Sequence, residues 1–172
     1  DGTTYTSTGA QTYEANDIDI TAGADVTFTT TNTAVEFQDG AAGQIVLSDD
    51  TDLTITTSGG NITIAPTIAG TDSGGGNTAE DITLNAAGGT VTFSNTGAAV
   101  LATDIGDVTL TGATIALSNS ITSTGTNSAG NAATIDINGA VTLNDNDITF
   151  TTGGAGIDFS STIVSGSTTP RA

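Results

Sequence analysis

The chain has 172 residues and a formal net charge of −18, with 1 Lys or Arg residue against 19 Asp and Glu. It contains no His and no Cys, which excludes zinc sites, Cys nucleophiles, Ser-His-Asp triads and disulfide scaffolds. A single cationic side chain cannot neutralise phosphates, so we expect no nucleic-acid binding. No apolar stretch approaches the ~18 residues of a membrane span, so we expect no membrane insertion.

One short sequence pattern recurs along the chain, in which two β-branched or large apolar residues flank one polar residue. This alternation places both apolar side chains on one face of a strand and the polar side chain on the other. In chain order the pattern lies at 18–20, 26–28, 35–37, 53–55, 62–64, 82–84, 91–93, 108–110, 115–117, 135–137, 141–143, 148–150 and 157–159. No helical period is present, so the sequence predicts an all-β protein.

The strands are short and numerous, and Gly, Asn, Ser and Asp fill the gaps between them. These residues tolerate the backbone conformations of tight corners. Aromatic residues make up only 4% of the chain, which is little for a β-sandwich core. We therefore predict a right-handed parallel β-helix, a β-solenoid, in preference to the alternative of a β-sandwich.

A longer similarity joins two parts of the chain at an offset of about 95 residues, with 45–70 matching 141–165. Self-similarity at a fixed offset is typical of repeat proteins. We predict that residues 1–172 form a single solenoid segment with this internal repeat. We also expect the segment to be an excerpt of a longer repeat array.

Acidic residues gather in one turn of each predicted copy, and they are the candidate metal ligands: Asp49, Asp50, Asp52, Asp145 and Asp147. Carboxylate oxygens suit calcium, which takes 6–8 oxygen ligands. The sequence therefore predicts calcium as the one candidate cofactor. The alternative is that these Asp residues simply favour turns through side-chain-to-backbone hydrogen bonds.

Two side-chain patterns bear on further functions. Paired carboxylates can hydrolyse glycosides, but no Lys, His or Trp is present to orient a sugar, and we predict that the chain is not an enzyme. Thr-x-Thr strings begin at Thr54, Thr109 and Thr149, and regular Thr rows occur on ice-binding solenoids. Because the strings do not recur once in every predicted coil, we expect no regular Thr array.

Two segments resemble the repeats of a known group of proteins: STGAQTY at 7–13 and ITLNAAGGTVTF at 82–93. The chain resembles the repeats of large bacterial surface proteins of the filamentous-haemagglutinin-like and autotransporter-like kind. The resemblance implies an extracellular, cell-surface β-solenoid that acts as a stalk, adhesin or matrix fibre. We expect self-association into oligomers or fibres, with surface glycans as further partners. The alternatives are a carbohydrate-binding or polysaccharide-active β-helix and an ice-binding solenoid.

Overall fold

The computed structural model describes residues 3–21, 24–48, 50–71, 79–94, 104–127, 129–145 and 147–166, and all regular structure in these ranges is β. The strands are β1 (Thr4–Ser7), β2 (Gln11–Ile20), β3 (Val26–Thr30), β4 (Val35–Leu47), β5 (Leu53–Thr57), β6 (Ile62–Ile64), β7 (Thr67–Gly70), β8 (Glu80–Asn85), β9 (Thr90–Phe93), β10 (Ile105–Leu117), β11 (Ile121–Ser123), β12 (Ile135–Leu143), β13 (Phe150–Thr152), β14 (Ile157–Phe159) and β15 (Ile163–Ser165).

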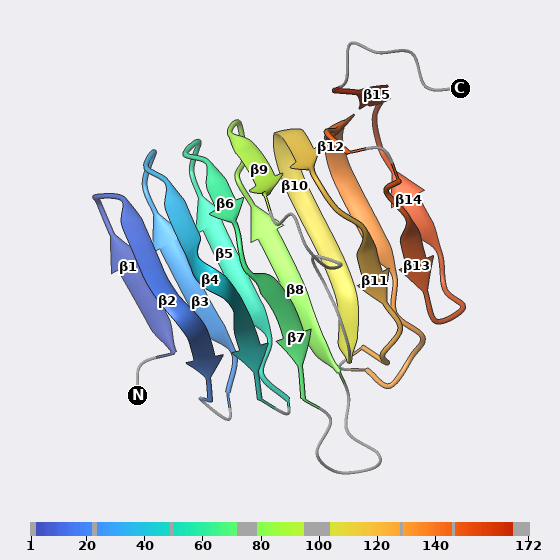
Figure 1. Ribbon diagram of the computed structural model, residues 1–172, viewed down its shortest axis with the longest axis horizontal. Helices are drawn as coiled ribbons and strands as arrows, with labels where there is room; N and C mark the ends of the chain where they lie inside the picture. Colours follow the sequence, from blue (N-terminus) through green and yellow to red (C-terminus); the bar gives the residue numbers. More distant parts are fainter. Residues whose placement is uncertain are drawn as a thin grey trace.

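The strands stack coil upon coil, and Figure 1 shows the coils following one another from β1 and β2 at one end to β13 and β14 at the other. Strands that pair side by side are therefore not consecutive in the chain, as in the order β1-β3-β5-β8-β10. Every strand pair is parallel, and paired residues lie one coil apart, as Val26 and Leu53 do. The predicted β-solenoid is therefore confirmed. The β-sandwich alternative is wrong, because it requires antiparallel pairing across two sheets.

Two long ladders of strands form opposite sides of the coil. We call the ladder β1-β3-β5-β8-β10-β12-β14 the first face; it uses the first halves of β10 and β12. The second face consists of the first halves of β2 and β4, then β6, β9, the second halves of β10 and β12, and β15. The ends of β2 and β4 pair onward with β7, and β11 pairs with β13.

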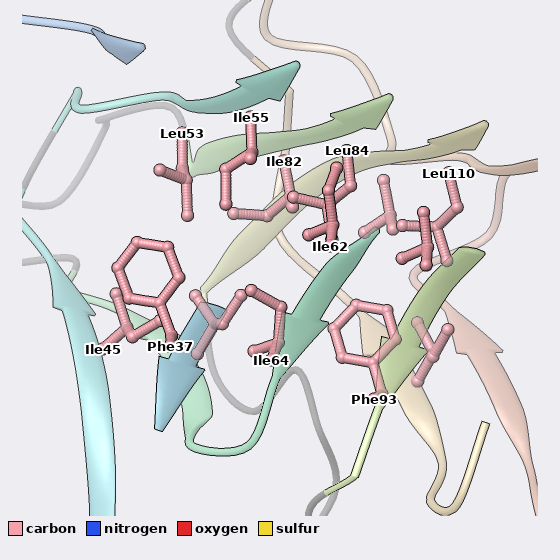
Figure 2. Close-up of a cluster of buried hydrophobic side chains, with 14 of the residues drawn as sticks. Phe37, Ile45, Leu53, Ile55, Ile62, Ile64, Ile82, Leu84, Phe93 and Leu110 are labelled. Carbon is pink, nitrogen blue, oxygen red and sulfur yellow. The ribbon is translucent and has the colours of Figure 1, made fainter. Parts of the chain in front are cut away.

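The core lies between the two faces and consists of columns of stacked apolar side chains. In β3 and β5 buried and half-buried residues alternate, as expected for strands with one inward side. Figure 2 shows Leu53 and Ile55 of the first face opposite Phe37, Ile64 and Phe93 of the second. All five side chains are fully buried. Burial of these columns is the main favourable term in the stability of the solenoid.

Glycines form a column of their own at the corner between the first and second faces. A Cβ atom on Gly60 would lie 2.0 Å from the Thr33 carbonyl oxygen, and one on Gly89 would lie 2.3 Å from that of Gly60. Gly139 meets Gly112 in the same way, at 2.2 Å. Successive coils therefore approach more closely at this corner than any residue with a side chain allows.

The two similar segments occupy different places on the coil. Residues 53–57 form β5 of the first face, whereas the matching region supplies β13, which pairs with β11 outside that face. Likewise, β6 belongs to the second face and its counterpart β14 to the first. Similar sequence thus serves different sides of the coil, because each side needs the same alternation of inward apolar and outward polar residues.

Candidate functional surfaces

Two columns of threonine cover the outer side of the first face. The register aligns Thr4, Thr27, Thr54, Thr83 and Thr109 in one column. The second column, two residues further along each strand, comprises Thr6, Thr29, Thr56, Asn85 and Thr111. Neighbouring strands lie about 4.8 Å apart and alternate residues along a strand about 6.6 Å apart, so the hydroxyls form a two-dimensional grid.

As expected from the sequence, Thr-x-Thr strings do not recur in every coil, because β8 carries Asn85 and β12 carries Asp136 and Asn138 at these positions. The register nevertheless aligns the strings of β1, β3, β5 and β10, an alignment that was not predicted from the sequence. The strings at Thr54 and Thr109 do lie on the first face, and those at Thr4 and Thr27 complete the array. The string at Thr149 does not belong to it, because β13 pairs with β11. A longer motif would have revealed the array in the sequence: DVTFT, DLTIT, DITLN and DVTLT occupy 25–29, 52–56, 81–85 and 107–111.

The threonine array is electrically neutral although the chain carries a net charge of −18. From β1 to β10 both columns contain only Thr and Asn85, and the first carboxylate in register with them is Asp136 of β12. In the part of the chain that the structure describes, the hydroxyls of Thr27, Thr54 and Thr83 make no hydrogen bond to another protein group. These groups are available to an external partner.

In four coils an Asp residue stands directly before the first buried apolar residue of the first-face repeat, that is before Val26, Leu53, Ile82 and Val108. These residues form a second repeated feature, which we call the Asp ladder: Asp25, Asp52, Asp81 and Asp107. Each carboxylate accepts a hydrogen bond from a backbone N–H of the next coil. Asp52 Oδ1 accepts from Asp81 N at 2.8 Å, and Asp81 Oδ1 accepts from Asp107 N at 2.6 Å. Asp107 Oδ1 accepts from both the N–H and the hydroxyl of Thr134, at 2.7 and 3.0 Å. The Asp ladder therefore joins successive coils at one corner.

Burial raises the pKa of Asp52 above its ordinary value of 3.8. The hydrogen bond from the Asp81 backbone acts in the opposite direction, while the carboxylates of Asp81, Asp25 and Asp50 add to the increase. Desolvation penalises the charged form and like charges repel, so both effects favour the protonated acid. The Asp52 side chain in this coil-to-coil contact therefore takes up a proton at a higher pH than an ordinary Asp side chain does.

The predicted calcium ligands lie in two separate turns. Asp52 belongs to the Asp ladder, and Asp50 is exposed with a φ of 57°. Asp145 and Asp147 are exposed between β12 and β13, and Asp49 lies outside the described residues. Among the residues that the structure does describe, no group of three or more acidic side chains is placed to hold a metal ion. Calcium binding at these turns stays a prediction.

Exposed apolar side chains occur at both ends of the solenoid. Tyr5 is 42% exposed and stacks on Phe28, with ring centroids 5.0 Å apart. At the other end Ile157 is 38% and Ile163 47% exposed, and they are in register with the buried Ile135 and Val141. These residues belong to the first and last described coils, where they continue the core columns. Among the described residues, both of these coils therefore present apolar side chains and strand edges.

Within the described ranges no helix is long and apolar enough to cross a membrane. The sequence matches no protein-family model, and no curated protein and no solved structure is significantly similar to it.

Proposed function

We propose that the chain is a non-enzymatic, extracellular β-solenoid segment of a bacterial surface protein or matrix fibre, which projects, spaces and self-associates. The observation that carries the proposal is the continuous parallel pairing of the first face from β1 to β14, with a one-residue register shift between Ile105 and Val108 of β10. A rod built this way can be lengthened by adding coils, because each coil contacts only its neighbours. The resemblance of the 7–13 and 82–93 strings to filamentous-haemagglutinin-like repeats supports the same class of protein.

The ends of the rod suggest how copies would associate. Ile157 extends the column of Ile135, and Tyr5 extends the column of Phe28. An in-register coil from a second copy would bury these side chains and pair the open strand edges. The net charge of −18 opposes close approach of two copies, so divalent cations that screen it should promote assembly.

Electron microscopy and light scattering of the purified chain, with calcium and then with a chelator, test this proposal. We expect fibres with calcium and shorter rods after chelation. Ile157→Lys should prevent end-to-end association, because it places a charge in the core column. The matched control is Val164→Lys, since Val164 is exposed on the outward side of β15, in register with Thr142.

Isolated rods under both conditions would contradict self-association, as would equal fibre formation by the two variants. A glycan array then tests the adhesive part of the proposal separately. Binding to a defined glycan, with no change in rod length, would place the adhesive role on the sides of the solenoid. If no glycan binds, the chain would act as a spacer and would have no adhesive activity of its own.

A further inference from the structure

We propose that the threonine array on the first face binds the surface of ice. The inference goes beyond the proposed structural role and does not depend on self-association. It rests on the two threonine columns that run from Thr4 to Thr109 and from Thr6 to Thr111.

The spacing of the array suits a crystalline surface better than a single soluble molecule. One hydroxyl recurs about every 4.8 Å from coil to coil and about every 6.6 Å between the two columns. A partner that matches all these positions must itself repeat in two dimensions over several coils. Ice is such a partner, because its surface presents hydrogen-bonding oxygens on a regular lattice.

The array is also rigid before any partner arrives. Thr is β-branched and has restricted side-chain rotation, so little rotamer freedom is lost on binding. Thr27, Thr54, Thr83 and Thr109 are all half-buried between their neighbours. Each Thr offers a methyl group beside its hydroxyl. The face can therefore exclude disordered water with the methyl groups while it holds ordered water with the hydroxyls.

The charge of the two threonine columns distinguishes ice from other repeating surfaces. A mineral or an anionic polymer would need charged ligands within the array, whereas both columns are neutral from β1 to β10. The adjoining carboxylates of the Asp ladder already accept hydrogen bonds from backbone N–H groups of the next coil. A polysaccharide crystal would favour exposed aromatic rings for stacking, whereas from β3 to β10 the side chains between the columns are the buried residues Phe28, Ile55, Leu84 and Leu110. Tyr5, in the same row of β1, already stacks on Phe28. Ice carries no net charge and needs no aromatic platform.

The test compares two double variants that differ only in the face they alter. Thr54→Tyr with Thr83→Tyr places bulky side chains in the middle of the threonine array. The control, Thr63→Tyr with Thr92→Tyr, makes the same change in adjacent outward positions of the second face. Tyr is a good strand residue, so both double variants should keep the β circular-dichroism spectrum.

We expect the wild-type chain to shape growing ice crystals and to be captured into a slowly grown ice ball. The variant with a disrupted threonine array should lose both properties, and the second-face control should keep them. If the double variants lose their β spectrum, the single variants Thr54→Tyr and Thr63→Tyr are compared instead.

Three results would overturn the proposal: no ice shaping or capture by the wild-type chain, equal loss in the two variants, or binding to crystalline cellulose or chitin without binding to ice. The last of these would assign the same face to a polysaccharide. Fibre formation is scored separately through Ile157→Lys, so the failure of ice binding can be distinguished from the failure of the structural role.

Discussion

The Asp52 carboxylate accepts a hydrogen bond from the backbone N–H of Asp81, 2.8 Å away and one coil further along the solenoid. The same contact joins Asp81 to Asp107 at 2.6 Å. The carboxylates of the Asp ladder thus satisfy backbone donors at a corner, where a strand partner's carbonyl does not reach. Because like charges repel, stacking carboxylates in this way lowers the stability of the folded chain.

Two substitutions of Asp52 distinguish the effect of the hydrogen-bond acceptor on stability from the effect of the negative charge. Asp52→Ala removes the acceptor of the Asp81 N–H and should lower the free energy of unfolding by about 1 kcal/mol. Asp52→Asn keeps an oxygen acceptor and removes the repulsion from Asp25, Asp50 and Asp81, so it should be at least as stable as wild type at pH 7. Urea denaturation followed by circular dichroism measures both. Equal loss in the two variants would show that the charge itself is required.

Stability should also depend on pH through Asp52. Its pKa is raised in the folded chain, so the folded state binds this proton more tightly than the unfolded state does. The stabilisation that this proton gives to the folded chain is therefore fully present below pH 3.8, the ordinary pKa of Asp. It is lost as the pH rises through the pKa of Asp52 in the folded chain. The melting temperature of wild type minus that of Asp52→Asn should fall as the pH is raised from 3 towards 7. A difference that is constant or rises would contradict this.

The close approach at the glycine corner predicts a sharp contrast between two adjacent positions. Gly89→Ala would place a Cβ 2.3 Å from the Gly60 carbonyl oxygen and should cost about 1–3 kcal/mol of stability, as overpacking does. Gly88→Ala is the control, because a Cβ there meets nothing within 4 Å. Thermal denaturation of both variants measures the effect. Equal melting temperatures would show that the coils can move apart at this corner without cost.

Core substitutions should have graded effects along the rod. Phe37 is fully buried and lies 5.0 Å from the Tyr13 ring and 5.3 Å from the Phe28 ring. Phe37→Ala should destabilise the chain by about 3–5 kcal/mol. Phe159→Ala should cost clearly less, because Phe159 is only half-buried and its strand β14 pairs only with β12 among the described residues. Denaturant unfolding measures the difference, and similar losses would indicate that the end coil is as well packed as the centre.

Calcium binding is tested at the second acidic turn. If calcium binds there, titration calorimetry should give a binding heat, and calcium should raise the melting temperature because it binds the folded state preferentially. The double variant Asp145→Asn with Asp147→Asn should lose part of both effects. Asp17→Asn with Asp19→Asn, two exposed positions on β2, is the control of equal charge change. If wild type gives no binding heat and calcium leaves its melting temperature unchanged, the chain does not bind calcium.

The sequence was sufficient to predict the fold class, because inward apolar residues alternate with outward polar ones wherever a strand forms. In Val26-Thr27-Phe28 and Leu53-Thr54-Ile55 the apolar residues are buried and the Thr residues half-buried, as expected. Strands β1, β7, β11 and β15 were not predicted. Their sequences, such as the exposed TYTS of β1, lack the paired apolar residues on which the prediction depended.

The threonine array and the Asp ladder could not be predicted by the same reasoning, because both depend on the register between coils. Thr27 pairs with Thr54, and Thr54 with Thr83, but the corners between them differ in length. No fixed period therefore aligns these residues in the sequence. Segments that match at the offset of 95 residues lie on different sides of the coil. The Thr149 string therefore resembles the Thr54 string in sequence but lies outside the threonine array.

The stacking of coils also determines how the rod would respond to force. When a load pulls the two ends apart along the stacking direction, every coil carries the same tension in series, and the weakest boundary between coils separates first. Among the described residues β14 and β15 pair only with β12, so this coil would separate first while the remaining coils stay folded. Each detached coil adds its own length of extended chain, so the solenoid would lengthen stepwise under load.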